Sequence, residues 1–176
     1  MSYLSPAEFV TKMIDTGEAK IHMSTRDTLI RAYMAGAILA LAAVFAVTAT
    51  VMSGSALIGA LLFPVGVCML YLLGFDLLTG VFMLTPLAWL DQRPGASIRG
   101  ILRNWGLVFV GNFLGALTVA GMMAFIFTYG FSVPPNEIGQ KIGHIGEART
   151  LGYAHSGLIG LLTIFMRSVL RNWMVS

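Results

Sequence analysis

Charged residues are scarce in this sequence. Aspartate, glutamate, lysine and arginine make up 11% of its 176 residues, whereas hydrophobic residues make up 57%. Soluble globular proteins carry about 25% charged residues, so the composition predicts an integral membrane protein with one membrane domain. The single cysteine, Cys68, lies inside an apolar run, which excludes a disulfide framework. The first residues lack a basic stretch followed by a short apolar run, so we expect no cleaved signal peptide.

The motifs of common enzymes are also missing. The sequence contains no CxxC or HExxH metal motif, no glycine-rich phosphate loop after a strand and no serine elbow. We therefore predict no metal site, no cofactor and no enzymatic activity. The net charge of +3 is too small to indicate nucleic-acid binding, and the basic residues follow a membrane topology instead.

The apolar stretch at residues 56–90 is longer than one membrane crossing, which needs about 20 residues. Near its middle lie four residues that are unusual in a membrane helix, namely Gly74, Asp76, Thr79 and Gly80. A carboxylate and irregular backbone at bilayer depth are tolerated only inside protein or beside a wet cavity. We therefore predict a second transmembrane helix that is broken at residues 75–80. The half-helix that follows such a break offers free N–H groups and a positive dipole end to an anion.

The residues at this break support two interpretations. In the first, which the pattern favours, they form a pore loop. Leu77 or Leu78 then narrows the path as an apolar gate, and Thr79 offers its hydroxyl to a passing anion. Asp76 would cap the second half-helix by accepting its free N–H groups. In the second, the segment is a kinked helix whose buried Asp76 binds a neighbouring helix.

Residues 1–28 are predicted to form a cytoplasmic amphipathic segment. Ser5 and Glu8 match a capping box, with Pro6 at the first helical position. Apolar residues then recur at helical spacing until the helix ends near Gly17. Because its polar face carries both signs of charge, packing against the cytoplasmic end of the bundle is favoured over lying on the membrane surface.

Residues 29–176 are predicted to form the membrane domain. The expected spans are residues 29–52, 56–90, 104–129 and 151–176, joined by a turn at 91–95 and a polar loop at 130–150 with a short helix from Asn136. In the third of these spans, Gly111 and Gly115 form a GxxxG face, which predicts close packing against another helix. Asn112 lies between them and is expected to hydrogen-bond to a neighbouring helix.

Basic residues are distributed unevenly between the two sides of this topology. One side holds Lys12, Lys20, Arg26, Arg31, Arg93, Arg99, Arg103, Arg167 and Arg171. The other holds only Lys141 and Arg149. This asymmetry predicts a cytoplasmic N-terminus, and four spans return the C-terminus to the same side. Lys141 and Arg149 lie just outside the last span, where they either gather anions at the outer vestibule or anchor the chain at the interface.

Several segments, taken in order, resemble the formate/nitrite transporter family. They are Leu-Phe-Pro-Val-Gly at 62–66, Leu-Leu-Gly-Phe-Asp-Leu-Leu-Thr-Gly at 72–80, Asn-Trp at 104–105, Gly-Asn-Phe-Leu-Gly-Ala at 111–116 and Asn-Trp-Met-Val at 172–175. The match covers nearly the whole chain, and the Gly-x-Asp-Leu-x-Thr-Gly loop is its most specific part. The sequence departs from the family pattern at Phe75 and Leu78, and at Arg171 and Ser176 around the last motif.

This resemblance implies an all-α, polytopic, aquaporin-like bundle of six spans per subunit, assembled as a homopentamer in the inner membrane. Each subunit would carry its own path for a small monovalent anion such as formate, nitrite or hydrosulfide. By resemblance, Leu77, Leu78 and Thr79 line the constriction, Asn172 is the polar group of the fourth span, and Arg149 attracts the anion. The family has two further spans, the first of which brings a histidine that faces the threonine. We therefore expect this chain to be C-terminally truncated or a fragment.

Two alternative functions stay open at this stage. The first is a pore for a neutral solute or for a weak acid in its uncharged form, and such a solute carries no current. The second is a non-transporting membrane subunit that completes its bundle with another chain, with which it would co-purify at a fixed stoichiometry.

Overall fold

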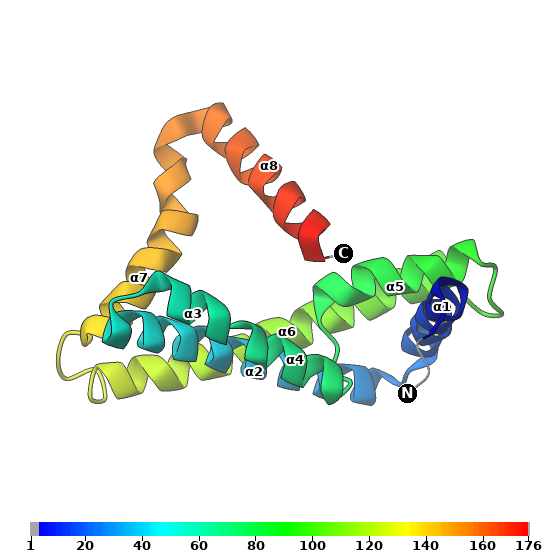
Figure 1. Cartoon of the computed structure of the whole chain (residues 1–176), viewed down its shortest axis with the longest axis horizontal. Helices are drawn as coiled ribbons and strands as arrows, with labels where there is room; N and C mark the ends of the chain where they lie inside the picture. Colours follow the sequence, from blue (N-terminus) through cyan, green and yellow to red (C-terminus); the bar gives the residue numbers. More distant parts are fainter. Residues whose placement is uncertain (1–3, 176) are drawn as a thin grey trace.

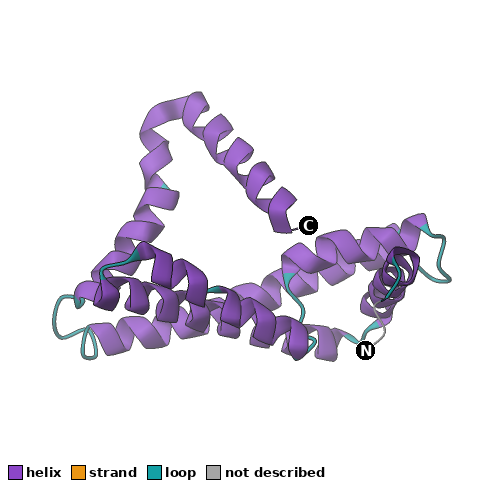
Figure 2. Cartoon of the chain, viewed as in Figure 1, coloured by secondary structure: helices purple, strands orange, loops and turns teal. Residues whose placement is uncertain are grey.

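The computed structural model describes residues 4–175, with side chains at all of these positions except 155 and 171–175. Throughout this range the regular structure is helical and includes no strand (Figure 2), which confirms the all-α class. The elements are α1 (Pro6–His22), α2 (Thr25–Ser53), α3 (Ala56–Leu62), α4 (Pro64–Leu72), α5 (Leu78–Leu90), α6 (Ile98–Phe127), α7 (Glu137–Arg149), the 3₁₀ helix η1 (Leu151–Ser156) and α8 (Gly157–Val175).

Two long helices, α2 and α6, lie side by side and form the centre of the fold (Figure 1). Glycines bring their backbones into contact, as the GxxxG face predicts. A Cβ added to Gly115 would come within 2.0 Å of the carbonyl oxygen of Tyr33, and one added to Gly36 within 2.0 Å of that of Asn112. Among the described helices, α2 and α6 are the two that are long and apolar enough to cross a membrane, whereas residues 56–72, 78–90 and 157–170 form shorter apolar segments.

The second expected span is interrupted twice. The first interruption is at Phe63, between α3 and α4, where Pro64 supplies no N–H to the helix. Both α3 and α4 pack along α2, and small residues again allow the helices to come close together. A Cβ added to Gly66, for example, would come within 2.3 Å of Cβ of Ala42. The second interruption separates α4 from α5 at residues 73–77.

At one end of the molecule, α1 packs against α5 and α6 (Figure 1). The predicted capping box is confirmed, since Ser5 and Glu8 bind each other's backbone N–H groups. Hydrogen bonds that Ser5 donates to the Glu8 carboxylate, chiefly from its backbone N–H, hold the pKa of Glu8 below its ordinary value. The predicted end of the helix near Gly17 is wrong, because α1 continues to His22. Gly17 is instead the contact point with α5, where an added Cβ would come within 2.0 Å of the Leu84 carbonyl oxygen.

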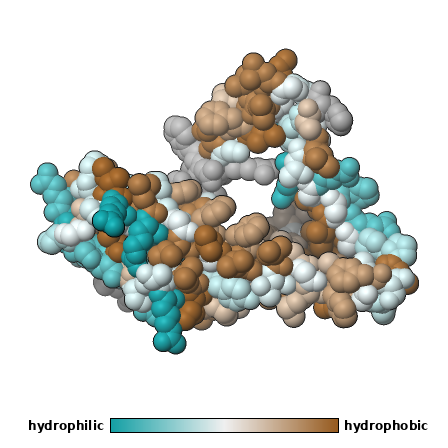
Figure 3. All heavy atoms as spheres, turned by 180° about the vertical axis from the view of Figure 1, so that it is seen from behind, coloured by the Kyte–Doolittle hydropathy of each residue, from teal (hydrophilic) through white to brown (hydrophobic). Residues whose placement is uncertain are grey.

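The turn between α5 and α6 fastens this end of the molecule. Arg93 pairs with Asp15 at 2.7 Å, Asp91 at 2.9 Å and Glu18 at 3.8 Å. His22 contacts the carbonyl oxygen of Pro94 through Nε2 at 3.0 Å. In Figure 3, hydrophilic residues gather at this end and again at the opposite side of the view, and hydrophobic residues lie between them. This distribution fits a membrane protein whose polar caps lie outside the apolar layer.

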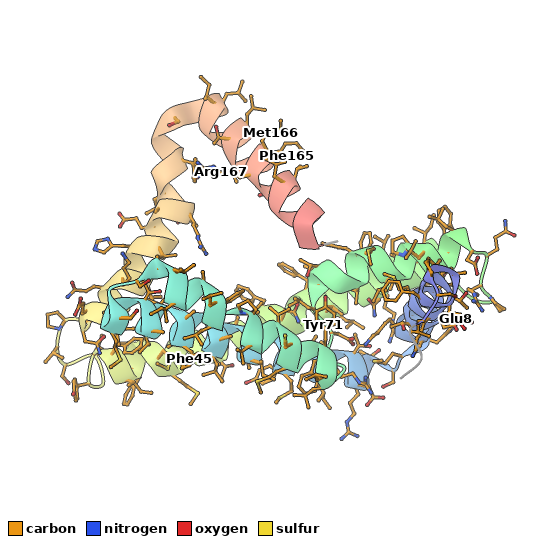
Figure 4. The ribbon with its side chains drawn as sticks, viewed as in Figure 1. Glu8, Phe45, Tyr71, Phe165, Met166 and Arg167 are labelled. Carbon is orange, nitrogen blue, oxygen red and sulfur yellow. The ribbon has the colours of Figure 1, made fainter. Side chains whose placement is uncertain are left out.

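The C-terminal elements extend away from the pair of long helices (Figure 1). Helix α7 begins as predicted, with the side chain of Asn136 accepting a hydrogen bond from the Gly139 N–H. The last helix begins at Gly157 rather than at 151, because residues 151–156 form a 3₁₀ helix. Arg167 of α8 binds the hydroxyl of Tyr153 and stacks over its ring at 5.5 Å from the centroid (Figure 4). This contact joins α8 to η1.

Candidate functional site

The candidate site lies where α4 ends and α5 begins. Helix α4 ends in a Schellman motif, in which the Phe75 N–H donates to Leu70 O at 3.0 Å and the Gly74 N–H to Tyr71 O at 3.2 Å. Gly74 has φ +67°, a left-handed conformation that glycine adopts without steric cost. Tyr71 also faces the start of α5, since its hydroxyl lies 4.0 Å from a Cβ added at Gly80 (Figure 4). Gly74 therefore ends the first half-helix and allows the chain to turn toward α5.

The second half-helix begins earlier than the predicted break at 75–80 suggests. Leu77 is extended, with φ −101° and ψ 137°, and the helix starts at Leu78. Leu78, Thr79 and Gly80 consequently form the first turn of α5 rather than part of the loop. Leu77 and Leu78 are half-buried on either side of this boundary. The residues predicted to line the constriction thus surround the N-terminus of a half-helix.

Asp76 does not cap the second half-helix, as the favoured interpretation predicts, but binds a neighbouring helix, as the second interpretation predicts. The residue is 1% exposed, and Oδ1 forms an ion pair with Lys20 of α1 rather than accepting N–H groups of α5. Leu77 is the N-cap residue of α5, and no side chain at that position caps the helix. The other carboxylate oxygen, Oδ2, is buried and has no hydrogen-bond partner among the described residues. Asp76 therefore ties the loop to α1.

Two basic residues stabilise the loop from the same end of the molecule. The Lys20 ammonium, which is 12% exposed, neutralises the charge of Asp76. The backbone oxygen of Lys20 accepts a hydrogen bond from Asn104 of α6 at 3.0 Å. Arg31 of α2 donates to the Gly74 carbonyl oxygen at 3.2 Å. Helices α1, α2 and α6 thus together hold the connection between the half-helices.

Asn112 of α6 takes the capping role that was predicted for Asp76. Its Oδ1 accepts a hydrogen bond from the Leu78 N–H at 3.0 Å, which is one of the N–H groups left free at a helix start. Its amide nitrogen donates to Asp76 O and to Ala32 O, both at 2.8 Å. The prediction that Asn112 binds another helix is confirmed, and the same side chain also holds the loop.

Thr79 differs from most threonines in the described part of the chain. At ten other positions the threonine hydroxyl donates to the carbonyl oxygen four residues earlier, namely Thr11, Thr16, Thr28, Thr48, Thr50, Thr85, Thr118, Thr128, Thr150 and Thr163. For Thr79 the fourth residue back is Phe75, which lies in the non-helical loop. The Thr79 hydroxyl oxygen is buried and has no hydrogen-bond partner in the described part of the chain. The hydrogen-bonding capacity of this hydroxyl is therefore unused in the described structure.

The rest of α5 is fixed by Trp105 of α6. Its indole N–H donates to Val81 O at 3.1 Å and to the Thr85 hydroxyl at 3.0 Å. The ring also packs edge-on against Phe82, with 4.6 Å between centroids. Because Pro86 lacks an N–H, it leaves one carbonyl of α5 without its helical partner. The contact with Trp105 keeps this weakened half-helix on α6.

The two residues predicted to attract anions lie apart from this loop. Lys141 and Arg149 are exposed on α7, which contacts α2, α6 and η1. Asn172 belongs to α8, and its side chain lies outside the described residues. Among the described residues, no group of three or more histidine, cysteine, aspartate or glutamate side chains is arranged to hold a metal ion.

Sequence reasoning missed the role of Lys20. This residue counted only as one basic charge on the cytoplasmic side, because nothing in the pattern joins it to a carboxylate that follows 56 positions later. The available signal was the buried acid itself, since a carboxylate at bilayer depth needs a cation. Several lysines and arginines could have supplied that cation, and only the packing of α1 selects Lys20.

Comparison with known proteins assigns this chain to a family. The family model described as formate/nitrite transporter matches residues 7–176. A probable formate transporter of Methanothermobacter thermautotrophicus is 30% identical over 99% of this chain and 67% of its own length. An uncharacterized transporter of Bacillus subtilis, YrhG, is 28% identical over 99% of this chain and 64% of its own.

A shorter match reaches the formate channel FocA of Haemophilus influenzae, which is 33% identical over 69% of this chain and 44% of its own length. The chain thus spans about two thirds of the length of the first two relatives. No solved structure matches the chain. The relatives are named as transporters or channels, not as enzymes.

Proposed function

The chain belongs to the formate/nitrite transporter family, and from this premise we propose that it conducts small monovalent anions, such as formate or nitrite, across the inner membrane of the cell. The family and the relatives named as formate transporters or channels support the coarser part of this proposal. Our proposal goes further than this support on two points, which are the anions that the protein conducts and the membrane in which it lies.

The observation that carries the proposal is the free hydroxyl of Thr79. A buried hydroxyl without a partner is unfavourable in a folded protein. It becomes favourable when a ligand accepts its hydrogen bond. Thr79 lies in the first turn of α5, where the helix dipole also favours negative charge. A small anion is therefore the ligand that suits this position.

The neighbouring residues complete the mechanism. Leu77 and Leu78 form an apolar constriction, at which an anion must shed part of its hydration shell. The Thr79 hydroxyl and the N-terminus of α5 replace some of the lost hydrogen bonds. The charge of Asp76 would repel an anion at this position, but Lys20 neutralises it. The constriction thus excludes bulk water while remaining tolerant of one negative charge.

The remaining site residues take supporting roles in this proposal. Lys141 and Arg149 are exposed and would concentrate anions outside the membrane through their positive charge. Asn172 would supply a further polar group of the last span, as the family resemblance implies. The functional assembly is a homopentamer in which each subunit has its own path. The molar mass of the purified protein in detergent, measured by light scattering, tests the assembly independently of transport.

The main experiment compares Thr79→Val with Thr118→Val in liposomes that contain the purified protein. Valine keeps the shape of threonine and removes the hydroxyl. A hydrogen bond to a charged group is worth about 1.5–3 kcal/mol, so Thr79→Val should lower formate flux roughly 10- to 100-fold. Thr118 is exposed on α6 and binds its own helix backbone, so Thr118→Val should leave the flux unchanged.

The electrical response of the same liposomes separates an anion from a neutral acid. Formate flux that follows an imposed membrane potential supports anion conduction. Flux that is independent of the potential would replace the proposal with a pore for an uncharged weak acid. Equal formate flux in Thr79→Val and the unmodified protein would remove Thr79 from the mechanism. The absence of flux at every potential, together with a second membrane protein at fixed stoichiometry, would favour a non-transporting partner subunit.

A further inference from the structure

Asn112 connects three parts of the fold through one small side chain. Its amide nitrogen donates to Ala32 O on α2 and to Asp76 O in the loop, and its Oδ1 accepts from the Leu78 N–H at the start of α5. An asparagine amide has two N–H donors, and both are used here. A leucine of similar size could make none of these hydrogen bonds.

The backbone of Asn112 is itself fixed by the contact between α2 and α6. A Cβ added to Gly36 would lie 2.0 Å from the carbonyl oxygen of Asn112. The neighbours Gly111 and Gly115 face α2 in the same way, with an added Cβ 2.5 Å from the Ala32 Cβ and 2.0 Å from the Tyr33 O, respectively. Because the two backbones touch, the short amide reaches both the α2 backbone and the loop. The backbone from which the Asn112 side chain extends is therefore held in place by this contact.

The hydrogen bonds act on the residues that line the constriction. The bonds to Asp76 O and from the Leu78 N–H bracket Leu77, whose extended conformation separates the loop from α5. No side chain at the N-cap position performs this task, and the carboxylate of Asp76 is bound to Lys20. The conformation of Leu77 and the position of the Thr79 hydroxyl thus depend on a residue of another helix.

We propose that Asn112 is the positioning residue that sets the shape of the constriction at Leu77–Thr79 and thereby its selectivity for small anions. This inference rests on the proposed function as far as selectivity is concerned. The part that concerns the shape of the loop can be measured without transport. Asn112 need not touch the anion, because it acts through the backbone of Asp76 and Leu78.

The experiment follows the accessibility of position 77. Leu77→Cys is introduced together with Cys68→Ser, and its reaction with a small methanethiosulfonate reagent is timed in the purified protein. Each of the three hydrogen bonds contributes roughly a factor of 2 to 10 to the stability of the loop. Adding Asn112→Leu should therefore raise the labelling rate at least about tenfold. In liposomes, Asn112→Leu without Leu77→Cys should reduce the ratio of formate flux to lactate flux by a similar factor.

The control is Thr28→Val. Thr28 is a fully buried polar residue of α2, but its hydroxyl donates to the Ser24 carbonyl oxygen at the start of its own helix rather than to the loop. Thr28→Val should leave both the labelling rate and the flux ratio unchanged. If Asn112→Leu does not accumulate in the membrane, Asn112→Ser provides the same test. Serine is too short to reach the three partners, and small residues pack well between transmembrane helices.

The outcomes distinguish this inference from the proposed function. A labelling rate in Asn112→Leu and Asn112→Ser that matches the parent Leu77→Cys protein overturns the inference, whether or not the protein transports. A raised labelling rate with an unchanged flux ratio overturns the part that concerns selectivity. A raised labelling rate in a protein that moves neither anion leaves Asn112 as the positioning residue of the loop and removes the proposed transport function.

Discussion

The ion pair between Lys20 and Asp76 shows how one residue contact can decide the chemistry of the proposed constriction. Asp76 is buried beside the N-terminus of α5, where an uncompensated carboxylate would oppose an anion. The ammonium group of Lys20, which belongs to α1, compensates that negative charge by forming an ion pair with it. The pair also links the loop to α1. The ion pairs of Arg93 with Asp15 and Glu18 hold α1 at the same end of the molecule.

Removing Lys20 should destabilise the protein strongly. Lys20→Met keeps the length of the side chain but leaves the Asp76 charge buried without a partner, and breaking a buried pair in this way costs about 3–5 kcal/mol. Lys12→Met is the control, because Lys12 is exposed on the same helix and such surface changes stay within about 0.5 kcal/mol. The measurement is thermal unfolding in detergent.

A double variant tests the cause of this loss. Lys20→Met combined with Asp76→Asn removes both charges, so the double variant should recover most of the stability that Lys20→Met loses. Equal instability of the single and double variants would show that the methylene contacts of Lys20, rather than its charge, stabilise the loop.

At the scale of elements, α6 organises the site. It presents Asn104 to α1, Trp105 to α5 and Asn112 to both α2 and the loop. These side chains share a face with Val108 and Gly111, both of which are buried. One helix therefore positions α5, the loop before it and the N-terminal helix, which explains why polar groups recur along an otherwise apolar span.

Close contact between α2 and α6 should be sensitive to a single methyl group. Gly115→Ala places Cβ 2.0 Å from the Tyr33 carbonyl oxygen, so the backbones must move apart, and overpacking of this kind costs about 1–3 kcal/mol. Gly106→Ala on the same helix meets no atom within 4 Å, so it should be neutral or stabilising by up to about 1 kcal/mol, as expected for alanine in a helix. Thermal unfolding of the two variants compares the effects directly, and equal midpoints would contradict the close packing.

Local patterns were enough to predict most of these elements. The capping box at Ser5 and Glu8, the N-cap at Asn136 and the GxxxG face at Gly111 each depend on residues within one or two helical turns. Gly17 shows where such patterns fail. Its sequence context is typical of a helix end, yet the glycine allows α1 to contact α5 within the helix. A local pattern cannot distinguish a stop from a contact, because the partner is far away in sequence.

The site required contacts that span the whole molecule. The break itself followed from Gly74, Asp76 and Thr79, which are close in sequence. The cap of α5 did not, since it comes from Asn112, which is 34 positions beyond Leu78. The Asp76 carboxylate could have accepted hydrogen bonds from the start of α5 or bound a neighbouring helix, and either contact would compensate for its burial. Only the placement of α1 next to the loop decides between these alternatives.

The two ends of the molecule differ in charge in a way that predicts its orientation. Helix α1 and the turn at 91–97 form one polar end, where the His22 ring contacts Pro94 O and Arg103 binds Met23 O and Thr25. Helix α7 leaves from the opposite end of the long helices (Figure 1). Most lysines and arginines of the sequence belong to the first end, and such an excess marks the cytoplasmic side.

This orientation can be read from two exposed lysines, Lys12 on α1 and Lys141 on α7. Each is replaced by cysteine in a Cys68→Ser background, and intact cells are treated with a membrane-impermeant maleimide. Lys141→Cys should react at once, whereas Lys12→Cys should react only after the membrane is permeabilised, because the positive end of the protein is retained in the cytoplasm. Equal labelling of both variants in permeabilised cells controls for accessibility. Labelling of Lys12→Cys alone in intact cells would reverse the assignment, and the exposed charges of α7 would then face the cytoplasm, where they could not gather anions arriving from outside.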